Sequence, residues 1–481
     1  MSTALITFCN RILYGLKCVA VMVLILQIWP SFGQDVDLPD LVMDPAEVEA
    51  IYRVLEGINH DIDWRSMFPG NPCTDGPHGI ICDTDNNTWH VVELNLGWVS
   101  DYVNNPPCSD NATIDPAIFQ FSHLKKLFFY NCFTKMLRTI PSEIWKLASL
   151  QHLTFQSNSA LVGEIPPEIG NLTHLERLVL LENSLSGFIP AEIGNLKNLQ
   201  QLVLYRNEFI GLIPDTFQNL DSLKILDLSG NQLSGEIPHI LERLTSLLKL
   251  DLSDNLLSGG IPYELGNLEN LQLLDLSSNR LNGSIPDSLH KLSSMQYLLL
   301  GENLLGGPLP EFWGNLSNLI GLKLSDSSYK GRIPDSLGLL HLLNLLDLDN
   351  NQLVGSIPSS LGDLPSLYHM NLSSNLLSGP ILFPVSFMNR LGKNLHFHNN
   401  LGLCYRLPLI NVSSMEIAQC SSQRNSTLNG SSQTQQPSFA MNNSYASSSK
   451  RKPKSMVLLC SAILYCFSML QPVICKGMYH P

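Results

Sequence analysis

An Ile-Pro pair returns every 24 residues through the middle of this 481-residue chain. The pair, once written Leu-Pro, begins at positions 165, 189, 213, 237, 261, 285, 309, 333 and 357. A chain of this length is too long for one ordinary compact core. So strict a period instead predicts one structural unit stacked many times, with each unit buried against its neighbours.

Each period contains the same order of residue types. The block that opens at residue 223 supplies Leu223, Leu226, Leu228, Asn231, Leu233, Gly235, Ile237 and Pro238. This order is the leucine-rich-repeat pattern, and it predicts an α/β repeat fold: a right-handed solenoid of plant-type 24-residue units with disulfide-linked caps. A frayed thirteenth unit is expected around Leu395. The twelve full units begin at Val91, Leu124, Leu150, Leu175, Leu199, Leu223, Leu247, Leu271, Met295, Leu319, Leu343 and Leu367.

Each residue type in one unit has a structural reason for its position. Leu226 and Leu228 alternate with Asp227, which predicts a short strand with its leucines in the core and Asp227 outward. The Asn231 amide can bond backbone groups in the turn that follows, so these asparagines should stack as an internal ladder. Pro238 should end the strand-like path before a short helical stretch on the back.

The ends of such a stack need caps, because they would otherwise expose apolar edges to water. At the front, Asp44, Pro45 and Glu47 have the order of a helix start. Trp64 should help to close this first module. The apolar face of the expected helix consists of Val48, Ile51, Tyr52, Leu55 and Ile58.

Six cysteines between the terminal apolar segments indicate three disulfides in an exported protein. Contacts in a solenoid are local, so Cys404 must pair with Cys420, and the other four leave three possible pairings. Among these we favour Cys73–Cys82 and Cys108–Cys132. Cys132 takes the Asn position of its repeat, and Cys108 lies in the insertion just before it.

Both ends of the chain carry apolar segments. The first has the layout of a secretory signal peptide, with a non-cleaved anchor as the alternative. The last belongs to a glycolipid-anchor signal, to a single membrane span or to a fully secreted form. The expected segments are a signal peptide over 1–33, an N-terminal cap over 34–90, repeats over 91–390, a C-terminal cap over 391–420, a disordered Ser/Asn/Gln-rich linker over 421–455 and a hydrophobic anchor or anchor signal over 456–475.

Charge excludes one class of partner. Seven of the 29 Lys and Arg, but none of the 42 Asp and Glu, lie in residues 1–34 and 450–481, so the segment between them has a net charge of −20. This balance argues against nucleic-acid binding. It is compatible with a basic peptide partner.

Ten Asn-x-Ser/Thr sequons fit an extracellular location. A glycan on Asn371 would block part of the inner face, because this residue is expected on a strand. The expected glycosylation sites are Asn86, Asn111, Asn171, Asn282, Asn315, Asn371, Asn411, Asn425, Asn429 and Asn442.

With repeats and caps in place, residues 40–420 resemble the plant extracellular leucine-rich-repeat receptor-like proteins, whose motifs LxxLxLxxNxLxGxIP and NNLGLC they carry. The segments DWRSMFPGNPC, FFYNCF and FQSNSALVGEIP are most similar to the Piriformospora indica-insensitive group, a neighbour of the Too Many Mouths type. The resemblance implies a plasma-membrane protein of perception or signalling, in that group in root responses to a beneficial endophytic fungus. Pro77, Ser327 and Leu382 depart from the pattern, the first two suggesting local looseness.

The outward strand positions are where the period tolerates variety. Mid-array units carry Asp227, Asp251, Asp275 and Asp347, which we interpret as common filler of plant repeats and not as a metal site. The front units instead supply aromatic, basic and polar residues, the material of protein-interface hot spots. The alternative is that they are ordinary solvent-facing residues. The expected partner-binding residues are Phe128, Tyr130, His152, Gln156, Arg177, Glu182, Tyr205 and Arg206.

These features predict ligand recognition. No hydrolase arrangement surrounds His152 or His174 and an open sheet excludes no water, so we expect no catalysis, cofactor or metal. No stretch carries the motifs of a kinase. We expect a receptor-like protein, attached to the cell membrane by its C-terminal tail, that binds a peptide or protein and signals through a partner receptor kinase in responses to microbes or development. The alternative is a secreted inhibitor of a microbial cell-wall-degrading enzyme.

Overall fold

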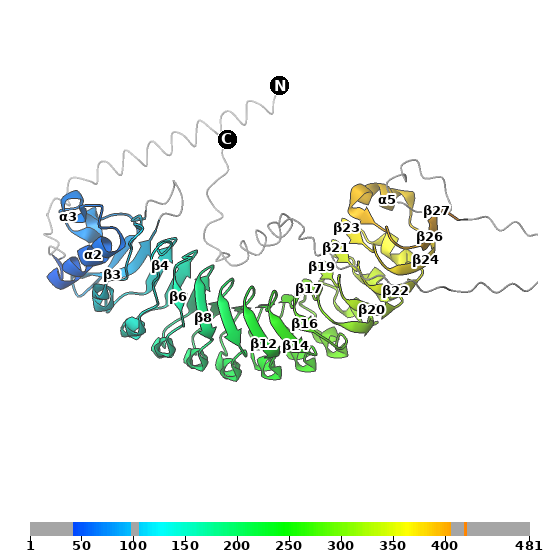
Figure 1. Ribbon diagram of the computed structural model, residues 1–481, viewed down its shortest axis with the longest axis horizontal. Coiled ribbons are helices and arrows are strands. Elements are labelled where there is room, and N and C mark those ends of the chain that lie inside the picture. The colour runs from blue at the N-terminus through cyan, green and yellow to red at the C-terminus, as the bar shows by residue number, and fades with distance from the viewer. Residues whose placement is uncertain (1–41, 98–104, 406–417, 421–481) are drawn as a thin grey trace, which may run out of the picture. The chain divides into compact units, whose positions relative to one another are not determined.

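The computed structural model describes residues 42–97, 105–405 and 418–420, all within one unit, Met1–Ser421. The repeats of this unit stack along a curve, with strands on the inner side and helical turns on the outer side (Figure 1). The expected signal peptide, linker and hydrophobic tail lie outside the described residues. Within those ranges, none of the helices combines the length and hydropathy that crossing a membrane requires.

One 15-stranded sheet runs through the stack, and each of the twelve expected unit starts leads into one of its parallel strands. At its N-terminal end β2 (Ile80–Asp85) pairs antiparallel with β3. The expected solenoid is therefore confirmed, with β25 as the short thirteenth strand. In sheet order the remaining strands are β1 (Val42–Met43), β3 (Thr88–Leu96), β4 (Lys126–Tyr130), β5 (His152–Gln156), β7 (Arg177–Leu181), β9 (Gln201–Val203), β11 (Ile225–Asp227), β13 (Lys249–Asp251), β15 (Leu273–Asp275), β17 (Tyr297–Leu299), β19 (Gly321–Lys323), β21 (Leu345–Asp347), β23 (His369–Asn371) and β25 (Leu395–His396).

Two six-stranded parallel sheets flank the large one. The first contains β6 (Val162–Gly163), β8 (Ser184–Phe188), β10 (Glu208–Gly211), β12 (Gln232–Glu236), β14 (Leu256–Gly259) and β16 (Arg280–Leu281). The second contains β18 (Gly306–Pro308), β20 (Ser328–Gly331), β22 (Gln352–Gly355), β24 (Leu376–Ile381), β26 (Gly402–Tyr405) and β27 (Ala418–Gln419).

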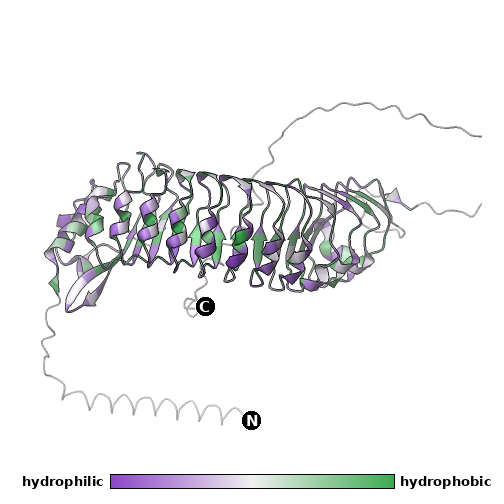
Figure 2. Ribbon diagram, turned by 90° about the horizontal axis from the view of Figure 1, so that it is seen from below, coloured by the Kyte–Doolittle hydropathy of each residue, from purple (hydrophilic) through white to green (hydrophobic). Residues whose placement is uncertain are grey.

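The back of each of the first eleven units is a single 3-10 turn, in which hydrophobic and hydrophilic residues alternate (Figure 2). Pro238, with φ −64°, stands directly before η7, as its place in the pattern predicts. The turns are η2 (Pro116–Gln120), η3 (Ser142–Lys146), η4 (Pro167–Asn171), η5 (Ala191–Asn195), η6 (Asp215–Asn219), η7 (His239–Arg243), η8 (Tyr263–Asn267), η9 (Asp287–Lys291), η10 (Trp313–Asn315), η11 (Asp335–Leu339), η12 (Ser359–Asp363) and η13 (Gly392–Asn394).

The core is one continuous apolar column, to which Leu226 and Leu228 contribute fully buried side chains. A ladder of asparagine amides runs beside it. Asn255 donates to the carbonyl oxygens of Leu228, Leu252 and Ser253 at 3.0–3.2 Å and accepts from the Leu233 N–H at 3.0 Å. Each such amide therefore bonds to its own unit and to the preceding one, as expected.

Two of the departures from the repeat are absorbed locally. The Ser327 hydroxyl donates a hydrogen bond to one carbonyl, that of Ser325, whereas a ladder asparagine such as Asn255 donates to three carbonyls. Strand β20 nevertheless keeps parallel register with its neighbours, so the expected looseness does not break the sheet. At Leu382 the chain leaves β24 and enters a true α-helix, α5 (Val385–Leu391), in place of a 3-10 turn.

The N-terminal cap is built on helix α2 (Pro45–Ile58), followed by the single turns α3 (Trp64–Met67) and α4 (Pro72–Asp75). Asp44 caps α2 as expected by accepting from the Ala46 N–H. Glu47 differs from the helix-start role, because its buried carboxylate accepts from the Val91 N–H of β3 at 3.1 Å.

Trp64 is buried in this cap, and its indole N–H donates to the Asn59 carbonyl at 2.8 Å. The structure contains the three disulfides that we favoured. They are Cys73–Cys82 in the N-terminal cap, Cys108–Cys132 between the insertion and the second repeat, and Cys404–Cys420 in the C-terminal cap. Covalent links therefore lie at both ends of the stack.

Asn255→Ala should lower the free energy of unfolding by about 1–3 kcal/mol, because it leaves the buried Leu233 N–H without its acceptor and removes one donor from each of three carbonyls. Chemical denaturation followed by circular dichroism measures the loss. Asn270→Ala is the matched control, since the Asn270 amide is exposed and donates to one carbonyl. Equal losses in the two variants would contradict the role assigned to the ladder.

Candidate ligand-binding face

We call the surface formed by the outward side chains of the large sheet the concave face. Adjacent parallel strands are in register, so equivalent residues stand side by side in rows. Lys126, His152 and Arg177 form one such row across β4, β5 and β7. Because neighbouring strands are about 4.8 Å apart, side chains in one row contact each other directly.

Five of the eight expected binding residues lie on these strands and form the floor of the front end. They are Phe128, Tyr130, His152, Gln156 and Arg177, all half-buried at alternate positions, while the residues between them are in the core. The rings of Phe128 and Tyr130 stack with centroids 6.3 Å apart. We refer to these five residues as the front floor.

Burial lowers the pKa of His152, and the cations Arg177 and Lys126 on either side lower it further. The ring is therefore held neutral at physiological pH, next to two positive charges. A neutral imidazole can donate and accept a hydrogen bond at the same time. This part of the face can bind both donors and acceptors of a ligand.

The other three expected residues, Glu182, Tyr205 and Arg206, lie just beyond the ends of β7 and β9 and not on the strands. Glu182 and Arg206 adopt left-handed backbone, with φ +56° and +51°. Their side chains form an ion pair at 3.1 Å, and the Arg206 guanidinium lies 4.8 Å above the Tyr205 ring. The eight residues therefore form a floor and a neighbouring rim, and we call these three the front rim.

The middle of the concave face holds a feature that the sequence analysis treated as filler. Asp227, Asp251 and Asp275 stand side by side on β11, β13 and β15, and each is 5–9% exposed. Lys249 is shared between two of them, at 2.7 Å from Asp227 and 3.3 Å from Asp251. We call the three carboxylates the acid row.

Electrostatics in the acid row follow from its burial. Burial and the carboxylates on both sides raise the pKa of Asp251 to about 8. Burial also raises the pKa of Asp275. Burial alone would lower the pKa of Lys249, but the attraction of Asp227 and Asp251 outweighs it and raises that pKa. The row thus holds three carboxylates and one lysine, which pairs with two of them. Part of the row therefore stays protonated at neutral pH.

A local motif positions these carboxylates. In each unit the Asp side chain accepts from the N–H and the hydroxyl of the serine two residues later, at 3.0–3.2 Å and 2.5–2.7 Å. Asn371 takes the same place on β23 and makes the same two bonds to Ser373. The repeated Asp-x-Ser was visible in the sequence, but the burial was not.

The far end of the face carries histidines. The His369 imidazole lies 2.9 Å from the Asp347 carboxylate, and the rings of His369 and His396 are 5.5 Å apart. Asp347 is therefore part of an imidazole–carboxylate pair and not of the acid row. The concave face thus has three chemically different parts along its length.

Six of the ten sequons lie within the described residues. Asn371 is half-buried on β23, on the concave face, as the repeat pattern predicts. The other five asparagines are exposed, at positions 86, 111, 171, 282 and 315. The remaining four, Asn411, Asn425, Asn429 and Asn442, lie outside the described residues.

The stability of the array should depend on pH through Asp251. Its pKa is about 8 in the folded chain against an ordinary 3.8, so the folded state binds the extra proton and stability falls as pH rises from about 4 to 8. Asp251→Asn should flatten this dependence in denaturation curves recorded at pH 5 and pH 8. The amide fits, because Asn371 occupies the equivalent site.

Exposed Asp287→Asn is the control and should retain the wild-type dependence. An Asp251→Asn protein that loses as much stability as the wild type between pH 5 and pH 8 would contradict the assignment.

Comparisons with known proteins agree with this architecture. The family described as Leucine-rich repeat region matches residues 106–255, and the Leucine Rich Repeat family matches residues 246–268, 270–292 and 342–364. Piriformospora indica-insensitive protein 2 of Arabidopsis thaliana is 40% identical over 161 residues, which are 32% of this chain and 37% of that protein. Protein TOO MANY MOUTHS of the same plant is 38% identical over 136 residues, 28% of this chain and 27% of that protein. The chain thus spans about a third of the length of these curated relatives.

Solved structures show the same fold. The plant peptide hormone receptor RGFR1 in complex with RGF2 is 35% identical with a TM-score of 0.55, covering 61% of this chain and 47% of that chain. The crystal structure of PEPR1-AtPEP1 is 29% identical with a TM-score of 0.61, covering 78% of this chain and 55% of that chain. Together with the repeats and caps, these matches show a leucine-rich-repeat solenoid that is similar to plant receptor-like proteins.

Proposed function

We propose that this protein is the extracellular recognition module of a plant receptor complex and that it binds a peptide or protein on its concave face. The observation that carries the proposal is the front floor, where aromatic, imidazole and guanidinium groups stand in register on three rigid strands. The structural likeness to a peptide hormone receptor in complex supports it. The chain contributes recognition, and catalysis is not part of the proposed role.

The geometry of the floor suits an extended partner. A peptide that crosses the strands meets one outward side chain about every 4.8 Å, and an extended chain rises about 3.3 Å per residue, so about three of its residues span two strand spacings. Phe128 and Tyr130 would supply apolar contact area, while Arg177 would pair with an acidic group. Because the strands are fixed by the core beneath them, little backbone freedom remains to be lost on binding.

The rim has a different role from the floor. The Glu182–Arg206 pair is partly exposed, and such a pair contributes little to stability by itself. It holds Arg206 over the Tyr205 ring, however, so both groups are oriented before a partner arrives. We expect the rim to set orientation and association rate, and the floor to supply most of the affinity.

Signal transmission is proposed to require a second protein. The sequence carries no kinase motif, so a partner receptor kinase would carry the signal inward. Secretion by residues 1–33 and attachment through residues 456–475 complete the proposal and place the repeats on the extracellular face of the cell membrane. Glycans on the exposed sequons would leave the front floor clear, whereas one on Asn371 would cover the far end.

The triple variant Tyr130→Ala/Arg177→Ala/Tyr205→Ala should lose its specific partners, because it removes anchors from both floor and rim. The measurement is affinity capture from plant extracellular and membrane fractions, with bound peptides and proteins quantified by mass spectrometry. We expect at least a tenfold loss, since removing two or three interface anchors costs several kcal/mol. A partner set unchanged from wild type would dismiss this face.

The outer side of the solenoid offers a control set that also contains two aromatic residues and one arginine. Trp145, Arg243 and Tyr263 are exposed on the 3-10 turns η3, η7 and η8. Their replacement by alanine should leave the captured set intact, and a loss equal to that of the first variant would show non-specific adhesion. Inhibition of a microbial polygalacturonase by the soluble protein would favour the inhibitor function over the receptor function.

A further inference from the structure

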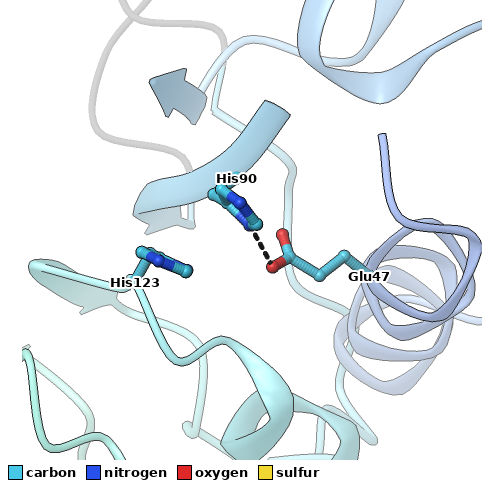
Figure 3. Close-up of side chains that lie close together, drawn as sticks. All are labelled: Glu47, His90 and His123. Atoms are coloured by element: carbon cyan, nitrogen blue, oxygen red, sulfur yellow. Dashed lines mark hydrogen bonds and ion pairs between the residues drawn. The ribbon is translucent and has the colours of Figure 1, made fainter. Parts of the chain in front are cut away.

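Three side chains far apart in the sequence meet where the N-terminal cap joins the first repeats (Figure 3). Glu47 comes from helix α2, His90 from strand β3, and His123 from the turn between η2 and β4. Each offers one ligand atom, and these atoms lie within 4.8 Å of one another. None of the three residues belongs to the front floor or the front rim.

The contacts within this cluster are close. The Glu47 carboxylate is 2.8 Å from the Nδ1 atom of His90 through one oxygen, and its other oxygen accepts from the Val91 N–H. The His90 and His123 rings stack with centroids 3.9 Å apart. The Nδ1 atom of His123 lies 3.1 Å from the Ser122 hydroxyl. Two imidazoles and one carboxylate therefore converge, and neighbouring groups hold two of them in place.

Burial makes the cluster more than a surface coincidence. The Glu47 side chain is 9% exposed and that of His90 is 18% exposed. A carboxylate removed from water to this extent gains from a positive charge beside it. Among the described residues, the group beside the Glu47 carboxylate is the His90 imidazole. It is not a Lys or Arg, whose permanent positive charge would balance the carboxylate at every pH.

The residue types point to the kind of ion. Two imidazoles and a carboxylate are a ligand set of zinc sites, with metal–ligand distances of about 2.0–2.2 Å. Ligand atoms around such an ion are about 3.3–3.5 Å apart, so the widest separation in the cluster must contract by up to about 1.5 Å. Small rotations of the partly exposed rings can supply this movement. Solvent access through His90 and His123 leaves a fourth position open to water.

We propose that Glu47, His90 and His123 bind a zinc ion that fastens the N-terminal cap to the first two repeats. The three ligands belong to three segments that also meet through apolar packing, backbone hydrogen bonds and the Lys126–Glu93 ion pair. An ion at their junction joins α2 to β3 and to the start of β4. Since it binds the folded chain alone, it stabilises the cap by an amount that grows with the logarithm of the free ion concentration above its Kd.

The test uses the purified full chain, free of affinity tags and pretreated with a chelator. Calorimetric titration with Zn²⁺ should show one site per chain. The melting temperature should rise when the ion is added and fall to its original value when a chelator removes the ion. Co²⁺ should produce the visible absorption bands of a four-coordinate site. Absence of binding, or a site that leaves the melting temperature unchanged, would overturn the proposal.

Variants identify the ligands. His123→Gln should weaken Zn²⁺ binding by at least tenfold, because even the loss of a residue that only orients a metal ligand costs about 10–100-fold in affinity. The substitution should preserve the fold, because the half-buried His123 ring makes its hydrogen bond to the adjacent, exposed Ser122. His90→Gln should do the same, with circular dichroism checking that the cap is intact.

His174→Gln is the matched control. His174 precedes the first leucine of its unit, as His123 does, and its Nδ1 atom is 3.1 Å from the Ala148 carbonyl oxygen. The affinity of the His174→Gln protein for Zn²⁺ should equal that of the wild-type protein. Equal binding by the His123→Gln and wild-type proteins, or equal losses in the His123→Gln and His174→Gln proteins, would assign the ion to other residues.

Discussion

The structure depends on hydrogen bonds and apolar contacts that no repeat can make alone. Asn255 illustrates the constraint, because its amide serves carbonyl groups of its own unit and of the preceding one while its oxygen accepts from Leu233. Leu226 and Leu228 are likewise covered by the units on either side. A free end would expose this interior, so caps with disulfides are a physical necessity of the design.

This rigid interior explains where variety can occur. Positions that face the core are held to leucine, and ladder positions to asparagine or an equivalent, whereas outward strand positions meet only their row neighbours. The concave face has consequently diverged into a front floor of aromatic and basic groups, a central acid row and a histidine-bearing far end. A partner that extends along the array would meet these environments in a fixed order.

The acid row also shows how a repeated motif creates a property that one repeat lacks. A single Asp-x-Ser unit would be a solvated carboxylate with an ordinary pKa. Three units in register place Asp227, Asp251 and Asp275 beside one another with one lysine, and burial then raises the pKa of Asp251 and Asp275. The front floor has the opposite character, because burial and the cations Arg177 and Lys126 lower the pKa of His152.

The sequence by itself determined the solenoid, the unit boundaries, the ladder, the Cys404–Cys420 disulfide and which residues of β4, β5 and β7 face outward, and it favoured the other two disulfides among three pairings. It could do so because contacts in a solenoid are made between neighbours, so the period and the strand alternation fix them. Tertiary structure alone decided that Glu182 and Arg206 form a rim, that Asp251 is buried, and that Glu47 meets His90 and His123. Those facts depend on how turns, rows and a docked cap pack in space, and no period in the sequence records such packing.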